Sequence, residues 1–410
     1  MKRDSNEFFK ECYGVAIAAA QPDEALARLL PEPPRGRLVV VGAGKGAAQL
    51  AQSFERLYVG ALSGVVVTRY GYGAKCDRIE VIEAAHPVPD KNSFIAGERL
   101  LEAVNGLSED DLVVALICGG GSALLAAPIA PMALDDEIVL NQALLSSGAP
   151  IGEMNTLRRH LSKIKGGRLA EAAKPARVVT YLVSDVPGDD PAEVASGPTV
   201  AGKTTPEDAR AVIEKYKLDL PDSIQNVLES PAANCPFTNN PVHILASAAT
   251  SLNAVEKFAQ EHSIEVMFLG DAVEGEAREV AIEHAKIAIE AKHAGREVLI
   301  ISGGETTVTL KGKGKGGRNT EYLLSFAIEI AGQKGISAFA ADTDGIDGSE
   351  TNAGAFADWR SVKAMKSAGC DAQDRLDSND AYTAFDAIGA IFSPGPSGTN
   401  VNDLRLIWVR

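Results

Sequence analysis

The chain has 410 residues, of which 45% are hydrophobic and 23% charged, and its formal net charge is −15. These proportions are typical of a globular protein, and the length favours two domains over a single core. The excess of acidic residues argues against a nucleic-acid-binding protein, because no basic face is evident that could neutralise phosphates.

The cysteines and the apolar runs restrict the compartment and the partners. The five cysteines are scattered and have no CxxC spacing, which favours reduced thiols over a disulfide framework or a zinc site. No apolar run approaches the roughly 20 residues of a membrane helix, and the stretch MKRDSNEFFKECYG has no apolar core of signal-peptide length. We therefore expect a cytoplasmic monomer or homodimer with small-molecule ligands, and neither a nucleic acid nor a membrane as partner.

The first half of the chain alternates expected strands and helices. After a helical pattern over residues 7–30, apolar runs of strand length lie at 37–41, 65–67, 79–82, 112–118 and 178–183. Continuous apolar runs suit a parallel sheet that is covered on both faces. Ligands of such sheets bind at the carboxyl ends of the strands.

The turn after the first strand carries a lysine. Residues 42–47 (GAGKGA) match the GxGxxA form of the dinucleotide fingerprint, which alone is a weak signal. The next strand ends in Arg69 without the usual acidic residue for a ribose, so Lys45 in the turn favours an anionic group directly. His86, in the proline-rich loop HPVPD, is expected to be structural.

Three glycines follow the most apolar strand. In DLVVALICGGGSALLAAP the run 112–118 is broken by Gly119, Gly120 and Gly121, and Ser122 opens a helical pattern. Glycines allow a ligand to approach the backbone closely, and a helix start attracts phosphate or carboxylate. The alternative is a tight strand-to-helix turn without a ligand.

The segment MNTLRRHLSKIKGGRLAEAAK concentrates basic residues in an acidic protein. On a helix, Arg158 and Ser162 would share a face with Lys165. A solvated basic face is an equally good explanation by composition. The glycine pair after Lys165 favours anion binding, and we include Asn155 of the same segment among the binding candidates.

Carboxylates and hydroxyls cluster after the strand at 178–183, in SDVPGDDPAEVASGPT. Asp185 and Asp189 are candidates for Mg²⁺, which usually takes one or two carboxylates and keeps several waters. Asp190 before Pro191 is expected to be a helix N-cap instead. Ser184 and Ser196 add hydroxyl groups to the same loops.

Residues 200–241 are rich in Pro, Asn and charge and are expected to be a linker. Strands then restart at 243–246, 266–269, 298–301, 338–341 and 404–409. We therefore expect two α/β domains with mostly parallel sheets. Residues 1–235 would form a Rossmann-like domain and residues 236–410 a second α/β domain.

The stretch 311–321 (KGKGKGGRNTE) is basic, rich in glycine and leads into a helix. It does not match a Walker A loop, and it could be a mobile, solvated hairpin tip. Arg318 and Asn319, at the expected start of that helix, suit a bidentate grip on phosphate or carboxylate. Glu321 could order the arginine or bind a metal.

Taken together, these loops resemble the class II glycerate 2-kinase family, whose carboxyl-terminal region is known as the MOFRL domain. The motifs occur in the same order over nearly the whole chain: GAGKGA, HPVPD, GGGSALL, NTLRRHLSKIKGGRLA, SDVPGDDPAEVASGPT, GGET, GKGGRNTE, DTDGIDG and GPSGTNVNDL. The resemblance implies phosphorylation of D-glycerate to 2-phosphoglycerate with ATP and Mg²⁺, in a cleft between two α/β domains.

By that similarity, Lys45 and Arg318 are expected to be essential. From the chemistry we expect each to be poorly paired without ligand, and Asp185 to join them in catalysis. The residues expected to bind substrate or phosphate are Gly44, Gly119, Gly120, Gly121, Ser122, Asn155, Arg158, Lys165, Ser184, Ser196, Asn319 and Glu321. The metal would lie on Asp185 and Asp189. This sequence departs from the family pattern at Cys118, where a serine is usual, and in GGRNTE, DGIDG and SPGPSGTN.

An NAD(P)H-dependent hydroxypyruvate reductase is the alternative, since proteins of this kind have sometimes carried that label. It depends on GAGKGA, and it is disfavoured by the missing ribose carboxylate and the many anion loops.

Overall fold

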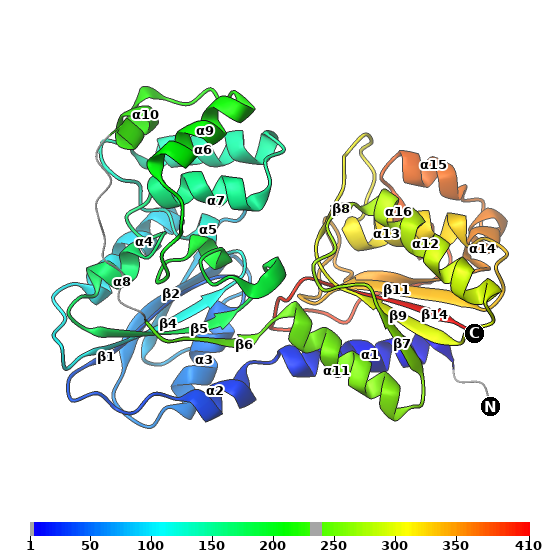
Figure 1. Ribbon diagram of the computed structural model, residues 1–410, viewed down its shortest axis with the longest axis horizontal. Coiled ribbons are helices and arrows are strands. Elements are labelled where there is room, and N and C mark those ends of the chain that lie inside the picture. The colour runs from blue at the N-terminus through cyan, green and yellow to red at the C-terminus, as the bar shows by residue number, and fades with distance from the viewer. Residues whose placement is uncertain (1–3, 230–239) are drawn as a thin grey trace. The chain divides into compact units, whose positions relative to one another are not determined.

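A computed structural model describes residues 4–229 and 240–410 (Figure 1). It divides the chain into two compact units. We call Pro22–Leu245 the N-terminal unit and Met1–Gln21 with Ala246–Arg410 the C-terminal unit. None of the helices in these described ranges has the length and hydropathy needed to cross a bilayer.

The N-terminal unit is built on a six-stranded sheet of order β3-β2-β1-β4-β5-β6. Its strands are β1 (Leu38–Ala43), β2 (Ser63–Arg69), β3 (Ile79–Ala84), β4 (Leu112–Cys118), β5 (Arg177–Val183) and β6 (Val242–Ala246). The pairs β1–β2, β1–β4, β2–β3 and β4–β5 are parallel. This order is that of a Rossmann fold, as expected from the sequence. Every residue of β1 and β4 is buried, which explains their unbroken apolar runs.

Helices cover this sheet and extend beyond it. They are α2 (Asp23–Leu29), α3 (Ala47–Leu57), α4 (Lys91–Val104), α5 (Gly121–Leu124), α6 (Leu134–Ser146), α7 (Ile151–His160), α8 (Arg168–Ala172), α9 (Pro206–Tyr216) and α10 (Asp222–Glu229). Two 3₁₀ turns, η1 (Pro187–Asp189) and η2 (Val194–Ser196), follow β5.

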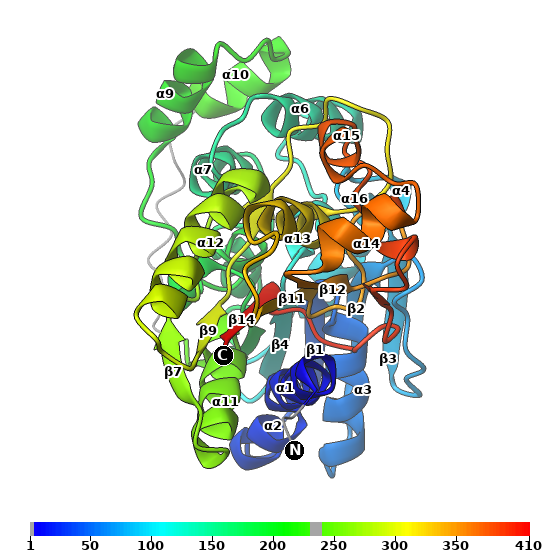
Figure 2. The same ribbon diagram turned by 90° about the vertical axis from the view of Figure 1, so that its right-hand side faces the viewer.

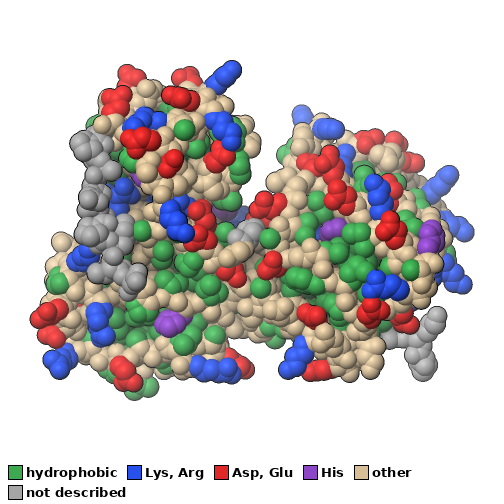
Figure 3. Space-filling model, in the orientation of Figure 1, with side chains coloured by type: hydrophobic (Ala, Val, Ile, Leu, Met, Phe, Trp, Pro, Cys, Tyr) green, Lys and Arg blue, Asp and Glu red, His purple; other side chains and the backbone are tan. Residues whose placement is uncertain are grey.

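The region expected to be a linker is largely helical. Helices α9 and α10 pack with α6 and α7 around an apolar cluster that includes Leu144, Leu157, Val212 and Ile224 (Figure 1). The expectation of a linker over 200–241 was therefore wrong for its described part. Pro206 stands at the first position of α9, and Pro221 precedes α10. Over α9, basic and acidic side chains are interspersed on the surface (Figure 3), and Arg210 pairs with Glu207.

The C-terminal unit has a mixed six-stranded sheet of order β13-β12-β11-β14-β9-β7. Its strands are β7 (Glu265–Phe268), β9 (Val298–Ser302), β11 (Ile336–Asp342), β12 (Gly354–Asp358), β13 (Ile391–Phe392) and β14 (Asp403–Val409). The short strands β8 (Gly275–Glu276) and β10 (Thr306–Thr307) pair separately. Only β7–β9 is parallel among the pairs of the large sheet. The expectation of a mostly parallel sheet thus fails in this unit, because β14 returns between β11 and β9.

Helices cover both faces of the second sheet (Figure 2). They are α1 (Ser5–Ala20), α11 (Ala248–Glu261), α12 (Ala277–His293), α13 (Arg318–Glu329), α14 (Ser361–Ser367), α15 (Ala372–Asp377) and α16 (Ala381–Asp386). One face packs against α1 and α11, and the other against α12 and α13.

The amino-terminal helix belongs to the C-terminal unit. Phe8 of α1 lies 4.7 Å from Trp408 of β14, and Phe9 lies 6.0 Å from Phe339 of β11, measured between ring centroids. The first domain expected from the sequence included this helix, so the two units are not contiguous in the chain. The boundary expected between residues 235 and 236 lies outside the described residues.

Candidate active site

The glycine turn after β4 is required by close packing. Gly120 has φ +76°, a conformation that favours glycine, and forms the N-cap of α5. A β-carbon on Gly121 would lie 2.7 Å from Cβ of Ala195 in η2. The turn therefore brings the carboxyl end of β4 against the loop that follows β5.

Asp185, just after β5, lies against the same turn. A β-carbon on Gly119 would be only 2.0 Å from Oδ2 of Asp185. The thiol of Cys118 is buried beside it, and burial, with the charge of Asp185, raises the pKa of that thiol. Ser184 is buried, and its Oγ accepts a bond from N–H of Val186 at 3.3 Å, so it holds its own turn.

Lys45 joins these residues from the turn between β1 and α3. Its N–H donates to the carbonyl of Gly119 at 2.9 Å, and its own carbonyl accepts from Oγ1 of Thr68 at 3.0 Å. A β-carbon on Gly120 would lie 3.1 Å from Cγ of Lys45. Gly44 has φ +133° and packs against Cys118, which explains the glycine before the lysine. Lys45, Asp185 and the glycines thus gather at one edge of the sheet, as the parallel strands predict.

His86, in the loop after β3, is affected by the charges of three basic residues. A β-carbon on Gly120 would lie 3.3 Å from Nε2 of His86. Burial, and then the charges of Lys45, Arg69 and Arg158, lower the pKa of His86 to about 4. The imidazole is consequently neutral near pH 7. We call Lys45, Arg69 and Arg158 the cation cluster.

A chain of hydrogen bonds connects α5, η2 and α7. The hydroxyl oxygens of Ser122 and Ser196 lie 2.8 Å apart, and Ser196 donates to Oδ1 of Asn155 at 2.9 Å. Arg158 donates to the same oxygen at 3.3 Å. Nδ2 of Asn155 donates to Oε2 of Glu193 at 3.0 Å. Four of the residues expected to bind substrate or phosphate therefore form one network.

Lys165 does not join this network. Its ammonium donates to Oε1 of Glu137 at 2.8 Å, and the two side chains are only 1% and 6% exposed. The helix α7 ends at His160, so the helical face that Lys165 was expected to share with Arg158 does not exist. Glu137 makes Lys165 part of a buried ion pair instead of a phosphate contact.

Burial lowers the pKa of Arg158 to about 10, and the charge of Glu137 opposes this shift.

The two carboxylates expected to hold Mg²⁺ lie in one loop. Asp189 ends the turn η1 with φ +55°. In the described ranges, no group of three or more His, Cys, Asp or Glu side chains is arranged to hold a metal. Asp185 and Asp189 supply the carboxylate oxygens that Mg²⁺ prefers, and their role as metal ligands stays a prediction. Asp190 accepts from N–H of Ala192 at 3.0 Å within a turn, so it does not cap an α-helix as expected.

In the C-terminal unit, Arg318 begins α13 and is surrounded by carboxylates. Its Nε lies 2.9 Å from Asp403, its Nη2 lies 2.6 Å from Asp342, and its Nη1 lies 3.0 Å from Glu305. Burial acts to lower the pKa of Arg318, but these charges outweigh it and raise that pKa well above its usual value. The expectation that Arg318 is poorly paired without ligand was therefore wrong.

Asn319 binds one of the carboxylates that surround Arg318. It is fully buried, and its Nδ2 donates to Oδ1 of Asp403 at 2.7 Å. Asp347 accepts the N–H groups of Asn319 and Thr320, each at 2.9 Å, and so caps the start of α13. Asn319 thus orders Asp403 and the helix start, and the structure gives it no exposed surface for a ligand.

Glu321 pairs with Arg278, and not with Arg318 or a metal as expected. Its carboxylate accepts from Nε of Arg278 at 2.5 Å and from Nδ2 of Asn379 at 3.0 Å. Burial raises the pKa of Glu321, and Arg278 opposes that shift. The carboxylate neither orders Arg318 nor faces a described metal group.

The glycine-rich loop over residues 311–317 lies against the chain through its glycines, while its three lysines are exposed. The N–H groups of Lys311 and Gly312 donate to Oδ1 of Asn379, at 2.7 and 2.9 Å. A β-carbon on Gly312 would lie 2.1 Å from the carbonyl oxygen of Ser378. The glycines are needed because the loop lies directly on the α15–α16 connection.

Sequence reasoning missed the acidic partners of Arg318. Asp342 ends β11 and Asp403 begins β14, and these antiparallel neighbours face each other in register. Glu305 follows β9 in the GGET motif. The sequence shows that these residues lie at strand ends. It does not show the strand order that brings them together.

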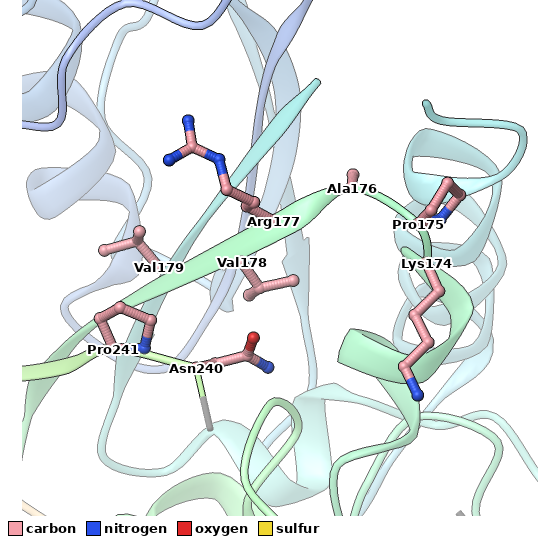
Figure 4. Close-up of a pocket in the computed structure, with 8 residues that line it drawn as sticks. All are labelled: Lys174, Pro175, Ala176, Arg177, Val178, Val179, Asn240 and Pro241. Carbon is pink, nitrogen blue, oxygen red and sulfur yellow. The ribbon is translucent and has the colours of Figure 1, made fainter. Parts of the chain in front are cut away.

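A separate cavity of about 480 Å³ lies at the beginning of β5. Lys174, Arg177 and Pro241 contribute to its lining (Figure 4). It lies at the amino end of that strand, whereas the glycine turn and Asp185 follow the carboxyl ends. We therefore assign the candidate active site to the carboxyl ends.

Family profiles match both parts of the chain. Residues 8–229 match the family described as "Domain of unknown function (DUF4147)", and residues 298–403 match the MOFRL family. The first match alone covers more than half of the chain. The chain belongs to the DUF4147/MOFRL glycerate kinase family.

Similar proteins of the glycerate kinase family carry two kinds of name. A D-glycerate 2-kinase of Thermotoga maritima is 39% identical, over 95% of this chain and 94% of its own. A protein of Agrobacterium vitis named "Putative hydroxypyruvate reductase" is 49% identical, over 99% of this chain and 94% of its own. The crystal structure of a T. maritima glycerate kinase has a TM-score of 0.89 at 37% identity, covering 98% of this chain and 99% of that one.

Membership in the glycerate kinase family confirms the resemblance found in the motifs. It also confirms the expected α/β architecture with two domains, through the likeness to a solved glycerate kinase. The two names among the relatives leave the reaction itself to be argued from the site.

Proposed function

We propose that this protein is a glycerate 2-kinase, which transfers the terminal phosphoryl group of ATP to the 2-hydroxyl of D-glycerate and releases 2-phosphoglycerate and ADP. The observation that carries the proposal is the cation cluster beside the glycine turn. Three cations next to a neutral histidine suit the phosphates of ATP. The T. maritima relative named D-glycerate 2-kinase supports the same reaction.

In this proposal Lys45 contacts the phosphoryl group, and the glycines from Gly119 to Gly121 let the backbone come close to it. The network of Ser122, Asn155, Arg158 and Ser196 holds the surrounding loops in place. Lys165 and Glu321 are left out of ligand binding, because each side chain is buried and occupied by an ion pair. Phosphoryl transfer depends mainly on such positioning and on positive charge.

Asp185 and Asp189 are the residues that would contact Mg²⁺. Bound Mg²⁺ neutralises developing charge on the phosphates. Asp185 lies against Gly119, and in the proposal it orients the attacking 2-hydroxyl. The guanidinium of Arg318 is held by three carboxylates. We propose that it serves the same reaction as a fixed positive charge within an acidic setting, rather than as a mobile anion binder.

The test reads the product directly. Protein, ATP–Mg²⁺ and D-glycerate are mixed with enolase but without phosphoglycerate mutase, and formation of phosphoenolpyruvate is followed by its absorbance. Enolase dehydrates 2-phosphoglycerate, so the signal is expected to rise at once. A signal that needs added mutase would mean that the 3-hydroxyl is the acceptor.

The second candidate is an NAD(P)H-dependent hydroxypyruvate reductase, which the name of the A. vitis relative favours. At the end of β2, where a ribose carboxylate would be expected, the chain has Arg69, which belongs to the cation cluster. Oxidation of NAD(P)H on addition of hydroxypyruvate, without turnover of ATP and glycerate, would establish the reductase and reject the kinase.

A further inference from the structure

His86 has the surroundings of a ligand contact, although a structural role was expected from the sequence. Among the described residues it makes no hydrogen bond or ion pair, and its side chain is half-buried. A β-carbon on Gly120 would lie 3.3 Å from its Nε2 and 3.5 Å from Cε of Lys45. The imidazole and the ammonium-bearing chain therefore line the same side of the glycine turn.

The charges that lower the pKa of His86 belong to basic residues in three elements. Lys45 lies in the β1–α3 turn, Arg69 ends β2 and Arg158 lies in α7. The carboxylate described on the same turn is that of Asp185, which lies against the neighbouring Gly119. Burial and the three like charges keep the imidazole neutral, with a pKa of about 4.

An oxyanion among these cations would reverse the balance of charge at the imidazole. Each negative charge placed beside His86 favours the protonated form, as the three cations disfavour it. Binding of the anion and binding of the proton then strengthen each other by the same factor. We propose that His86 takes up a proton when an oxyanion occupies the cation cluster of Lys45, Arg69 and Arg158, and becomes a fourth cationic contact for that anion.

This inference rests on the proposed function only in placing a phosphate or carboxylate at this site, and it adds a residue and a proton. It also predicts the direction in which the affinity for the anion changes with pH. Because the anion raises the proton affinity of His86, the affinity for the anion increases as pH falls through the pKa of the occupied site. The increase ends below pH 4, where the empty site is protonated too.

The experiment uses sulfate as the probe, since its charge does not change in the range studied, and the full chain without Mg²⁺. Sulfate binding is measured by calorimetry between pH 7.5 and 5, in pairs of buffers that differ in ionisation enthalpy. If the occupied site has an ordinary histidine pKa, affinity should rise by roughly 10- to 30-fold across this range, with uptake approaching one proton.

The variant His86→Asn cannot be protonated, so it should bind sulfate with little pH dependence while retaining Asp185 and all three cations. His243→Asn is the matched control. His243 lies in β6 and stacks on Tyr181 of β5, and this variant should behave as the wild type. The buffer comparison on the wild type needs no variant, so a poorly folded variant would not obscure the result.

Sulfate binding without proton uptake, a pH dependence that persists in His86→Asn, or no sulfate binding at all would each overturn the inference. The outcome is separable from the kinase assay because no turnover is measured. Proton uptake in a protein that fails to phosphorylate glycerate would reject the proposed function and leave this inference standing. Phosphorylation of glycerate without proton uptake on sulfate binding would support the proposed function and reject this inference.

Discussion

Asp403 accepts from Nε of Arg318 through both of its carboxylate oxygens, at 2.9 and 3.1 Å. The carboxylate is fully buried, and it also accepts from Nη2 of Arg405 at 2.6 Å. Arg405 is itself buried, and its Nη1 donates to the carbonyl of Gly303 at 3.0 Å. The arginine expected to be catalytic is thus anchored to the core of the C-terminal unit.

Arg318→Ala should lower stability as well as activity. Removing the guanidinium takes one cationic partner from the buried carboxylates of Asp403 and Asp342, although Asp403 keeps Arg405. Breaking a buried pair costs on the order of 3–5 kcal/mol. Both tryptophans lie in the C-terminal unit, so denaturant unfolding followed by tryptophan fluorescence reports on this unit.

The control is Arg296→Ala, which removes an exposed pair with Glu265 in the same unit and should change stability by less than about 1 kcal/mol. Equal stability of Arg318→Ala and Arg296→Ala would contradict the structural role of the carboxylates around Arg318.

Lys45→Ala should lower the turnover of glycerate by roughly 10²-fold or more, the scale of losing a charge contact in the transition state. Steady-state kinetics with the enolase-coupled assay measures it. Lys75→Ala removes an exposed lysine of the same unit and should leave turnover unchanged. Near-normal turnover of Lys45→Ala would remove this residue from the mechanism.

Gly119→Ala should displace Asp185, because the added β-carbon would lie 2.0 Å from Oδ2 of that carboxylate. We expect a loss of turnover of about 10²-fold from misplacement of roughly 1 Å near the reacting groups. Gly152→Ala is the matched control, since nothing lies within 4 Å of its β-carbon position in α7. Similar kinetics for the two variants would mean that the position of Asp185 is not important.

Lys165→Ala should destabilise the N-terminal unit by on the order of 3–5 kcal/mol, because it leaves Glu137 buried without its partner. The double variant Lys165→Met with Glu137→Leu removes both charges and should recover much of that loss. Differential scanning calorimetry measures the change. If Lys165→Ala raised the KM for ATP at unchanged stability, the phosphate contact expected from the sequence would be right after all.

Acid should destabilise the C-terminal unit through His284. Burial, and then the charge of Arg405, lower the pKa of His284 to about 4, while its unfolded value is about 6.5. Its contribution to stability is present above pH 6.5 and is lost as pH falls toward 4. The loss between pH 7 and 4.5 should be roughly 2–3 kcal/mol.

His284→Gln should reduce this pH dependence, measured by tryptophan fluorescence in denaturant at both pH values. The glutamine also perturbs the contact with the Tyr322 hydroxyl, which lies 2.9 Å from Nδ1, so the comparison is between slopes and not between absolute stabilities. An unchanged slope would show that His284 does not titrate in this way.

Several features of this protein followed from local sequence alone. The unbroken apolar runs of β1 and β4 predicted buried parallel strands, because side chains on both faces must then be apolar. The glycine turn and Lys45 could be placed at the same sheet edge, since parallel strands all end there. The ordered motifs indicated the family before any contact was known.

The partners of the charged residues were decided only by the tertiary structure. Arg318 and Lys165 both looked like anion contacts, and both are bound by carboxylates from distant parts of the chain, Asp403 and Glu137. The antiparallel return of β14 beside β11 brings Asp403 to Arg318, and residues 85 positions apart show no periodicity that would predict it. A charge is read from the sequence, but whether it meets a ligand or a counter-charge depends on burial and distance, which only the fold determines.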